Sequence, residues 1–470
     1  MILLEVNLKI KTIYVCSSCK FEQAKWTGRC PNCNTWNSFV ESEVLKKGNF
    51  KNPHASRDKN LNKAQRLSEI KVVNSDRIVT DLMEFNRVVG GGIVRDSISI
   101  LAAKPGAGKS TLLLQVAYDI ASKGNKVLYA SGEESESQIK KRAERIFENG
   151  IQENIWIYSD VSMNNVLNVI NEIDPDFIIV DSIQTFVLEE YSSRPGSPIQ
   201  TMECASELLK IAKDFNRPRA VMIVGQMTKE EELAGVRALE HLVDCVLIIE
   251  GDNLEELRSL VCSKNRFGST GEVGFFTMTE KGMVSIDNPS QFFMTKRDIS
   301  EQVFGSSLSV IKEGNRCIIV EIESLVSNTM SMYPSRIADC LNKDQLNILI
   351  SVLEQRGNLK LFDKNVVIKA TGGLKLREQC VNLAIIVSIV SSLKNKPIDN
   401  GYVFIGDVGL TGEIKRVPSI KLRLKEIDRM GFSRVYVPEG EDYSNLNFEN
   451  IELRKFRYIS QVINDVFKSK

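Results

Sequence analysis

The chain has 470 residues, enough for more than one domain, and its 43% apolar and 26% charged residues are typical of a globular protein. Lysine and arginine total 61 against 60 aspartates and glutamates, which excludes polyanion binding through a global basic charge. No apolar run approaches the roughly 20 residues that span a bilayer, and the N-terminal residues lack an export signal. We therefore expect a cytoplasmic protein without a membrane partner, whose ten cysteines are thiols or metal ligands.

Two Cys-x-x-Cys pairs lie close together near the N-terminus. Cys16 pairs with Cys19, and Cys30 pairs with Cys33. Each pair puts two thiolates on one tight turn, and two such turns can close a tetrahedral zinc site. A redox dithiol would need only one pair. We therefore predict a four-cysteine zinc ribbon over residues 1–45, whose folding depends on the metal.

A basic segment follows the ribbon. Residues 46–66 carry seven lysines and arginines against one aspartate, without hydrophobic periodicity. We expect a flexible linker over residues 46–75. Two uses of it remain open: a solvated tether, or electrostatic contact with nucleic-acid phosphates. Within the ribbon, Trp26, Trp36 and Phe39 are expected to pack, and the alternative is that they cover the metal or form a contact surface.

The segment AKPGAGKST, from Ala103 to Thr111, has the pattern of a phosphate-binding Walker A loop. A predicted strand at 97–103 precedes it, and a predicted helix follows it as far as Gly124. Ala103 replaces the first glycine of the pattern, a position that needs only an ordinary negative φ. The predicted ATP-binding residues are Ala103, Lys104, Pro105, Gly106, Ala107, Gly108, Lys109, Ser110 and Thr111.

Within this loop, four residues carry the chemistry. Gly106 and Gly108 let backbone amides curl around an anion. Lys109 can reach the β- and γ-phosphates, and Ser110 can ligate Mg²⁺. We therefore expect ATP and Mg²⁺ as cofactors.

Later apolar runs predict the strands of a parallel sheet at 126–131, 177–182, 221–226 and 245–250, and helical stretches such as 201–215 alternate with them.

Polar residues end three of these strands. Asp181 follows four apolar residues, the Walker B arrangement in which a carboxylate holds Mg²⁺. Glu133 and Glu134 follow the strand at 126–131, and one of them is expected to orient the attacking water. Gln226 ends another strand and is a candidate sensor of the γ-phosphate, although a plain surface amide is the alternative.

The chain resembles the bacterial RadA/Sms family over essentially its full length. Four features carry this resemblance: the ribbon, the Walker A region, the segment YASGEESESQIKKRA and the segment KNRFGST (Lys264 to Thr270). The resemblance implies a RecA-like ATPase domain at 76–287. It also implies a hexameric ring of identical subunits on single-stranded or branched DNA, in which ATP hydrolysis drives branch migration or unwinding together with the RecA recombinase. By the same resemblance, Lys264 and Arg266 would act at the subunit interface and contact either the neighbour's nucleotide or the DNA. The chemistry agrees with the first of these, since cations supplied in trans stabilise charge on the γ-phosphoryl group.

Two details of the site depart from the family or stay open. Family members commonly have histidine at the position of Gln226, which instead matches the sensor glutamine of RecA. Glu133 matches the position of the RecA base better than Glu134 does, but both remain candidates.

The C-terminal third, residues 301–470 after a linker at 288–300, has shorter strands and helices, with a hairpin expected at 407–414. It resembles the proteolytic domain of Lon proteases as a scaffold without the catalytic serine. Cys380 and Lys421 stand near the positions of the Lon serine and lysine, and we expect a packed thiol and a surface lysine. The predicted fold class is therefore α/β: a RecA-like P-loop core with a zinc ribbon and an α+β Lon-like domain.

Three functions follow from these features. A DNA-dependent ATPase motor for recombination and repair agrees with all of them. A RecA-fold regulatory switch that binds proteins without DNA disagrees with the ribbon and the KNRFG segment. An ATP-dependent protease disagrees with the missing serine.

Overall fold

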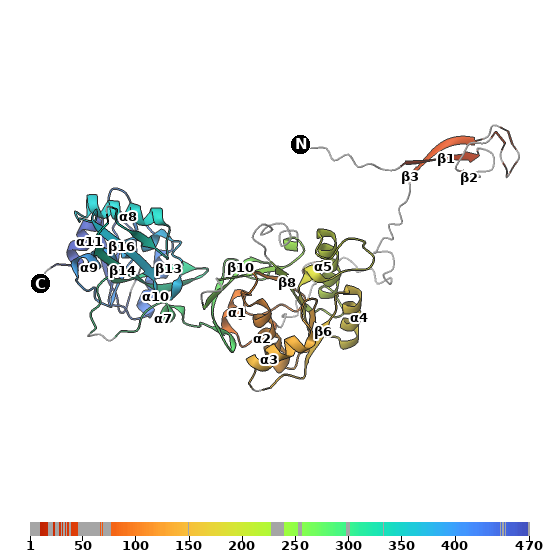
Figure 1. Cartoon of the computed structure of the whole chain (residues 1–470), viewed down its shortest axis with the longest axis horizontal. Helices are drawn as coiled ribbons and strands as arrows, with labels where there is room; N and C mark the ends of the chain where they lie inside the picture. The colour runs from red at the N-terminus through yellow and green to blue at the C-terminus, as the bar shows by residue number, and fades with distance from the viewer. Residues whose placement is uncertain are drawn as a thin grey trace. The chain divides into compact units, whose positions relative to one another are not determined.

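The structure is a computed structural model of the chain (Figure 1). It describes residues 77–468 apart from 149, 227–238, 252–255, 298–300, 332, 442, 444–445 and 447, and, before residue 77, three strands and scattered positions. The chain divides into one compact unit from Met1 to Val73 and another from Asn74 to Lys470.

The N-terminal unit contains a small antiparallel sheet in the order β2-β1-β3. Its strands are β1 (Ile10–Cys16), β2 (Glu22–Gln23) and β3 (Phe39–Leu45). Trp36 is 68% exposed, so the prediction that it packs within the ribbon is wrong. The Arg29 guanidinium lies 5.8 Å from the centre of its ring instead.

The second unit begins with a nine-stranded sheet in the order β12-β11-β10-β9-β4-β8-β7-β5-β6. Its strands are β4 (Ile98–Ala103), β5 (Val127–Ser131), β6 (Ile155–Ser159), β7 (Phe177–Asp181), β8 (Ala220–Gln226), β9 (Cys245–Glu250), β10 (Leu257–Asn265), β11 (Val273–Thr279) and β12 (Gly282–Ser285). The strands from β9 to β6 are parallel. The apolar runs predict all of these strands except β6. The strands β10, β11 and β12 extend the sheet in antiparallel pairs.

Helices cover both faces of this sheet, because its parallel strands are apolar on both sides (Figure 1). One face packs against α1 (Met83–Val88), α2 (Lys109–Ser122) and α3 (Glu136–Ile146). The other face packs against α4 (Met163–Ile173) and α5 (Pro198–Ala212). A short 3-10 turn, η2 (Ile183–Thr185), follows β7. The carboxyl ends of β4, β5, β7 and β8 therefore meet at one edge, where ligands bind in such sheets.

A second sheet, of seven strands, forms the C-terminal part in the order β15-β16-β14-β13-β17-β20-β21. Its strands are β13 (Ser306–Glu313), β14 (Arg316–Asn328), β15 (Arg336–Ala338), β16 (Lys364–Ala370), β17 (Tyr402–Phe404), β20 (Arg434–Pro438) and β21 (Glu452–Phe456). The pair β18 (Asp407–Val408) and β19 (Ile414–Lys415) is the predicted hairpin.

The helices of this part are α7 (Pro289–Phe292), α8 (Lys343–Arg356), α9 (Asn382–Lys394), α10 (Ile420–Arg429) and α11 (Ile459–Val466), with 3-10 turns η3 (Thr371–Gly373) and η4 (Gln379–Val381). Helix α9 packs on β13 and β14 and is buried from Asn382 to Ser391. Among the described residues, no helix is both long and apolar enough to cross a bilayer.

Candidate active site

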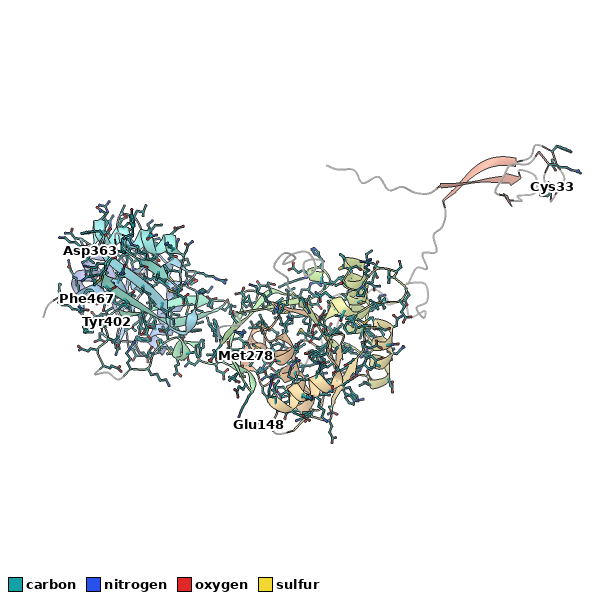
Figure 2. The ribbon with its side chains drawn as sticks, in the orientation of Figure 1. Cys33, Glu148, Met278, Asp363, Tyr402 and Phe467 are labelled. Atoms are coloured by element: carbon teal, nitrogen blue, oxygen red, sulfur yellow. The ribbon has the colours of Figure 1, made fainter. Side chains whose placement is uncertain are left out.

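The Walker A loop connects β4 to α2, as predicted. Gly106 and Gly108 have positive φ angles of 79° and 99°, which side chains rarely adopt. A Cβ at Gly108 would lie 2.4 Å from the terminal methyl carbon of Met278, the residue labelled in Figure 2, so this flexible side chain would have to move. Ala103 is the buried last residue of β4, where an extended backbone accepts alanine.

The amine of Lys109 lies across the loop. Its Nζ donates hydrogen bonds to the carbonyl oxygens of Ala103, at 3.1 Å, and Lys104, at 3.4 Å. Burial lowers the pKa of Lys109, while the carboxylates of Asp181 and Glu133 oppose that shift. The ammonium group is therefore held beside two carboxylates at the loop, where a phosphate can replace the carbonyl partners.

The hydroxyl of Ser110 and the carboxylate of Asp181 meet beside this lysine. Ser110 Oγ donates to Asp181 Oδ2 at 2.8 Å, and the phenol of Tyr129 donates to the same oxygen at 2.5 Å. Burial raises the pKa of Asp181, the two hydrogen bonds oppose that shift, and the charges of nearby Glu133 and Glu134 add to it. A hydroxyl and a carboxylate that converge next to a phosphate loop are hard oxygen ligands, so these residues fit Mg²⁺.

The two candidate bases have different partners. Glu133 Oε1 accepts hydrogen bonds from Ser182 Oγ, at 2.5 Å, and from Gln226 Nε2, at 2.8 Å. Glu134 instead forms a two-pronged ion pair with Arg142 of α3, at 2.7 and 2.5 Å. Glu133 therefore faces the sheet edge that carries the Walker residues, whereas Glu134 is engaged by a helix.

The sequence did not single out three residues of this site: Tyr129, Ser182 and Arg142. Tyr129 could have been found from the sequence, because a buried phenol hydroxyl needs a hydrogen-bond acceptor and this tyrosine lies in a strand next to the Walker B strand. Burial raises the pKa of Tyr129 well above its usual value, so it remains a donor to Asp181.

Lys264 and Arg266 lie far from this edge. Strand β10 is antiparallel to β9, and its end, Asn265, pairs with Cys245, which in turn pairs with Ser99 at the start of β4. Four residue steps, about 13 Å of strand, separate Ser99 from the Walker loop. The structure therefore does not bring the two cations together with the other predicted site residues of the same chain.

Both cations contact their own chain. Lys264 Nζ donates to the carbonyl oxygens of Glu240 and Val243, the latter at 2.8 Å. Arg266 Nη1 lies 3.2 Å from Oδ1 of Asp244, whose side chain is 3% exposed while that of Arg266 is 55% exposed. Of the two, Arg266 is the more exposed, whereas Lys264 is half-buried.

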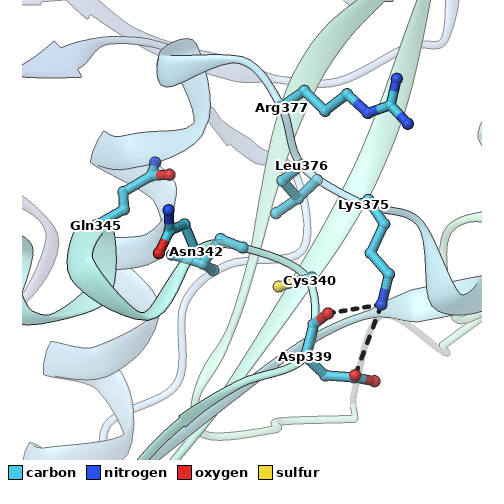
Figure 3. Close-up of a pocket in the computed structure, with 8 residues that line it drawn as sticks. Asp339, Cys340, Asn342, Gln345, Lys375, Leu376 and Arg377 are labelled. Atoms are coloured by element: carbon cyan, nitrogen blue, oxygen red, sulfur yellow. Dashed lines mark hydrogen bonds and ion pairs between the residues drawn. The ribbon is translucent and has the colours of Figure 1, made fainter.

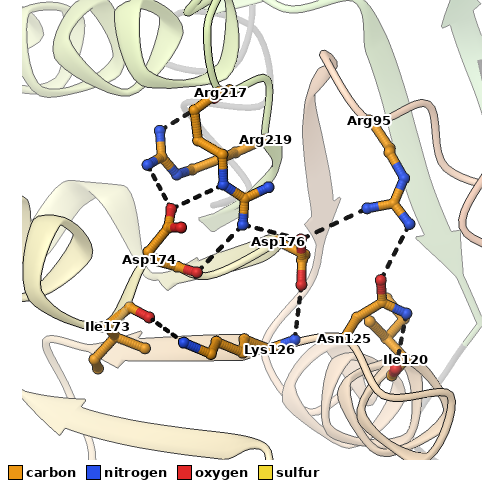
Figure 4. A network of polar contacts seen from close by, with 9 residues as sticks. All are labelled: Arg95, Ile120, Asn125, Lys126, Ile173, Asp174, Asp176, Arg217 and Arg219. Carbon is orange, nitrogen blue, oxygen red and sulfur yellow. Dashed lines mark hydrogen bonds and ion pairs between the residues drawn. The ribbon is translucent and has the colours of Figure 1, made fainter.

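A network of ion pairs lies at the amino ends of the parallel strands, on the side of the sheet where Lys264 and Arg266 lie (Figure 4). Asp174 lies 2.9 Å from Arg217 and 2.8 Å from Arg219, and Asp176 lies 3.0 Å from Arg217 and 3.7 Å from Arg95. These residues precede β7, β8 and β4, so the network ties the starts of three strands together.

The predicted zinc ligands are described only in part. Cys16 is the last residue of β1, and Cys33 is half-buried, with its Sγ 3.3 Å from Thr35 Oγ1. Cys19 and Cys30 lie outside the described residues. The cysteines after the ribbon segment are all buried free thiols: Cys204, Cys245, Cys262, Cys317, Cys340 and Cys380. The sulfur atoms of Cys245 and Cys262 lie 3.6 Å apart.

Cys380 and Lys421 do not form a dyad. The Cys380 thiol lies 3.3 Å from the carbonyl oxygen of Val310, and the buried guanidinium of Arg423 donates to its sulfur at 3.3 Å. Burial raises the pKa of Cys380, which opposes formation of a thiolate. Lys421 is exposed on α10. The expected packed thiol and surface lysine agree with this arrangement.

A cavity of about 440 Å³ lies in the C-terminal part, between the start of α8 and residues 375–377 (Figure 3). Asn342 and Gln345 line it, and Lys375 Nζ donates to the carbonyl oxygen of Asp339 at 2.8 Å. None of the predicted site residues line this cavity, so the arrangement around Lys109, and not the cavity, is the candidate active site.

Comparison with protein families matches two parts of the chain. Residues 64–232 match a family described as an AAA domain, and residues 14–41 match a rubredoxin metal binding domain. Among solved structures, an ATPase domain aligns with a TM-score of 0.38 and 16% identity, covering 45% of this chain and 91% of that one.

Curated relatives match nearly the whole chain. A DNA repair protein RadA of Bacillus subtilis is 42% identical and another of Listeria monocytogenes is also 42% identical, each over 92% of this chain and 93% of its own. A DNA repair protein RadA of Streptococcus pyogenes is 41% identical over 98% of this chain and 99% of its own. At these identities and lengths, the chain belongs to the RadA family of DNA repair proteins.

Proposed function

We propose that this chain is a DNA-dependent ATPase of homologous recombination and repair. It acts in the cytoplasm on single-stranded or branched DNA, together with a RecA recombinase, and ATP hydrolysis drives branch migration or unwinding. The convergence of Lys109, Ser110, Asp181 and Glu133 at one sheet edge carries the proposal, since it supplies the parts that phosphoryl transfer requires.

Each residue at this edge has a proposed task. Residues 103–111 bind the phosphates of ATP, and Lys109 moves from its carbonyl partners to the β- and γ-phosphates. Bound Mg²⁺ would neutralise phosphate charge, with Ser110 and Asp181 holding it. Glu133 orients the attacking water, since its carboxylate has no cationic partner like that of Glu134 among the described residues.

Gln226 links this base to the γ-phosphate. Its amide nitrogen donates to Glu133, and its own strand ends at the same edge. Because an amide has both a donor and an acceptor, it can bind a phosphate oxygen and the base together. Gln226 therefore has the chemistry of a sensor.

Lys264 and Arg266 act on the neighbouring subunit. In their own chain they lie at the end of the sheet opposite the Walker A loop, so they cannot contact a nucleotide bound to that loop. Head-to-tail contacts that close into a ring, hexameric by the family resemblance, would present these residues to the next active site. Cations supplied in trans stabilise charge on the γ-phosphoryl group.

The four cysteines Cys16, Cys19, Cys30 and Cys33 bind zinc, which the match to a metal-binding domain supports. Proteolysis is disfavoured, because the buried Cys380 thiol is held by Arg423 and Lys421 is exposed.

The proposed function is tested by ATP turnover with and without single-stranded DNA, with casein cleavage measured beside it. We expect DNA to stimulate turnover and casein to remain intact. Lys109→Ala should abolish turnover in both conditions, because its amine is the charged group beside the phosphates. Turnover unaffected by DNA would favour a regulatory switch, and unchanged turnover in Lys109→Ala would contradict the site.

A further inference from the structure

Arg77 lies where the chain enters the ATPase domain, and it joins two segments far apart in the sequence. Its Nη1 donates to the carbonyl oxygens of Gly92, at 3.0 Å, and Val89, at 3.4 Å. Its Nη2 donates to the carbonyl oxygen of Phe267, at 2.8 Å. Phe267 directly follows Arg266, so the guanidinium holds the backbone beside the proposed trans cation.

The first of these segments is shaped to bring its carbonyls to Arg77. The residue after Arg77, Ile78, forms a two-hydrogen-bond bridge with Ile93, at 2.8 and 2.9 Å. Between Val89 and Ile93, Gly92 has a φ of 131°, and a Cβ on it would lie 2.9 Å from the carbonyl oxygen of Ile78. Because Gly92 has no side chain, its backbone can lie close to that of Ile78, and the carbonyl oxygens of Val89 and Gly92 can both reach the guanidinium of Arg77.

The second segment is held by several hydrogen bonds, one of which joins the backbone N–H of Arg266 to the carbonyl oxygen of Asp244 at 3.0 Å. Asn265 Oδ1 accepts from the backbone N–H of Phe267 at 2.9 Å, and Arg77 binds the carbonyl of the same residue. The Asn265 Nδ2 is buried without a hydrogen-bond partner among the described residues. The two polar groups of Phe267 are thus held from opposite sides, and loss of Arg77 would release one of them.

Carbonyls, and not a carboxylate, are the partners of Arg77. Within the described part of the chain, no carboxylate lies within ion-pair distance of it. A planar fork with several donors suits three converging carbonyls, which an ammonium group cannot bind in the same geometry. The interaction therefore depends on the shape of the guanidinium as well as on its charge.

We propose that Arg77 is a positioning residue that sets the backbone of residues 265–268, and thereby Arg266, for action on the neighbouring subunit. This inference rests on the proposed trans role of Arg266. Arg77 lies near the start of the second unit, which begins at Asn74, and its side chain links this start to the segment that carries the trans cation.

Lys123 provides a matched control. Its Nζ donates to the carbonyl oxygen of Val79, at 2.8 Å, and to Asp81 Oδ1, at 2.7 Å. It therefore anchors the same incoming segment as Arg77 but does not contact residues 264–268. If Arg77 only anchored this segment, Arg77→Gln and Lys123→Gln would change ATP turnover by similar factors.

The test uses the full chain and measures kcat and KM for ATP with saturating single-stranded DNA. We expect Arg77→Gln to lower kcat about tenfold with little change in KM, because small displacements of a charged group strongly affect turnover. Arg77→Lys should restore part of the loss, and Lys123→Gln should stay within about twofold of the parent.

A double-mutant cycle with Arg266→Ala separates the inference from its premise. If Arg77 acts through Arg266, Arg77→Gln should have almost no further effect in the Arg266→Ala background. Three results would each overturn the role of Arg77. The first is a double variant whose fold-loss in kcat equals the product of the two single fold-losses. The others are parental kcat in Arg77→Gln, and equal losses of kcat in Arg77→Gln and Lys123→Gln. Parental turnover in Arg266→Ala would contradict the trans role and, with it, this inference.

Discussion

Glu133 and Glu134 show how far the role of catalytic base can be assigned to a single residue from the sequence. Two adjacent glutamates at the end of a strand both reach the ligand edge, so the sequence left either one as the base. The structure distinguishes them through Arg142, which lies eight residues further on in α3 and binds Glu134. That pairing depends on the angle between the helix and the strand, which has no signal in the sequence.

Replacing each glutamate by glutamine tests the assignment. Glu133→Gln should lower kcat about 10²- to 10⁴-fold while ATP binding is retained, because the amide cannot act as a base but keeps the shape. Glu134→Gln should lower kcat far less. Single-turnover hydrolysis and nucleotide titration measure the two effects. The opposite order of kcat values would reassign the base to Glu134.

The residues around Asp181 were predictable in part. The Walker residues were identified because phosphate chemistry restricts their type and spacing. Tyr129 was not, since nothing in an apolar run tells which side chain points at the neighbouring strand's carboxylate. Ser182 ends the predicted strand at 177–182 and was given no role there, although its hydroxyl donates a hydrogen bond to Glu133.

At the scale of elements, five of the parallel strands were predicted, whereas the parallel strand β6 and the antiparallel extension were not. The former are continuous apolar runs, as in strands buried on both faces. Strand β10 alternates buried and partly exposed residues and shifts register between Cys262 and Lys264. Its antiparallel direction is what puts Lys264 at the far edge, and a motif alone does not reveal that direction.

Helix α10 is anchored by one buried cation. Arg423 is 1% exposed and donates to the carbonyl oxygen of Val310, at 2.6 Å, and to Glu378, at 2.8 Å. Helix α10 is therefore tied through this guanidinium to strand β13 and to the segment that carries Cys380.

Arg423→Ala should destabilise the C-terminal part by about 3 kcal/mol, because it leaves buried acceptors without a donor. On the same helix, Arg429 pairs with Glu426 but is 61% exposed, so Arg429→Ala should cost less than about 1 kcal/mol. Urea unfolding followed by circular dichroism gives both values. Equal losses would show that Arg423 is not the anchor of the helix.

At the scale of the whole molecule, the composition was uninformative, because a balance of 61 basic and 60 acidic residues hides any local site. The local motifs carried the prediction instead, and the family is shown over nearly the whole chain. The family resemblance implied that Lys264 and Arg266 act at the subunit interface, but the course of strand β10 was not predicted. This strand separates the two cations from the active-site residues of their own chain across the sheet. This separation leads to the central claim, that a nucleotide bound by one subunit is completed by a cation from the next.

Mixing two inactive variants tests that claim most directly. Lys109→Ala lacks the phosphate-binding amine, and Arg266→Ala lacks the trans cation, so each alone should be nearly inactive with ATP and single-stranded DNA. In an equimolar mixed ring, random assortment should give about one interface in four an intact loop and an intact arginine. We predict recovery of up to about a quarter of the parental turnover. Turnover no higher than that of the two variants measured separately, in rings shown to have exchanged subunits, would contradict the account.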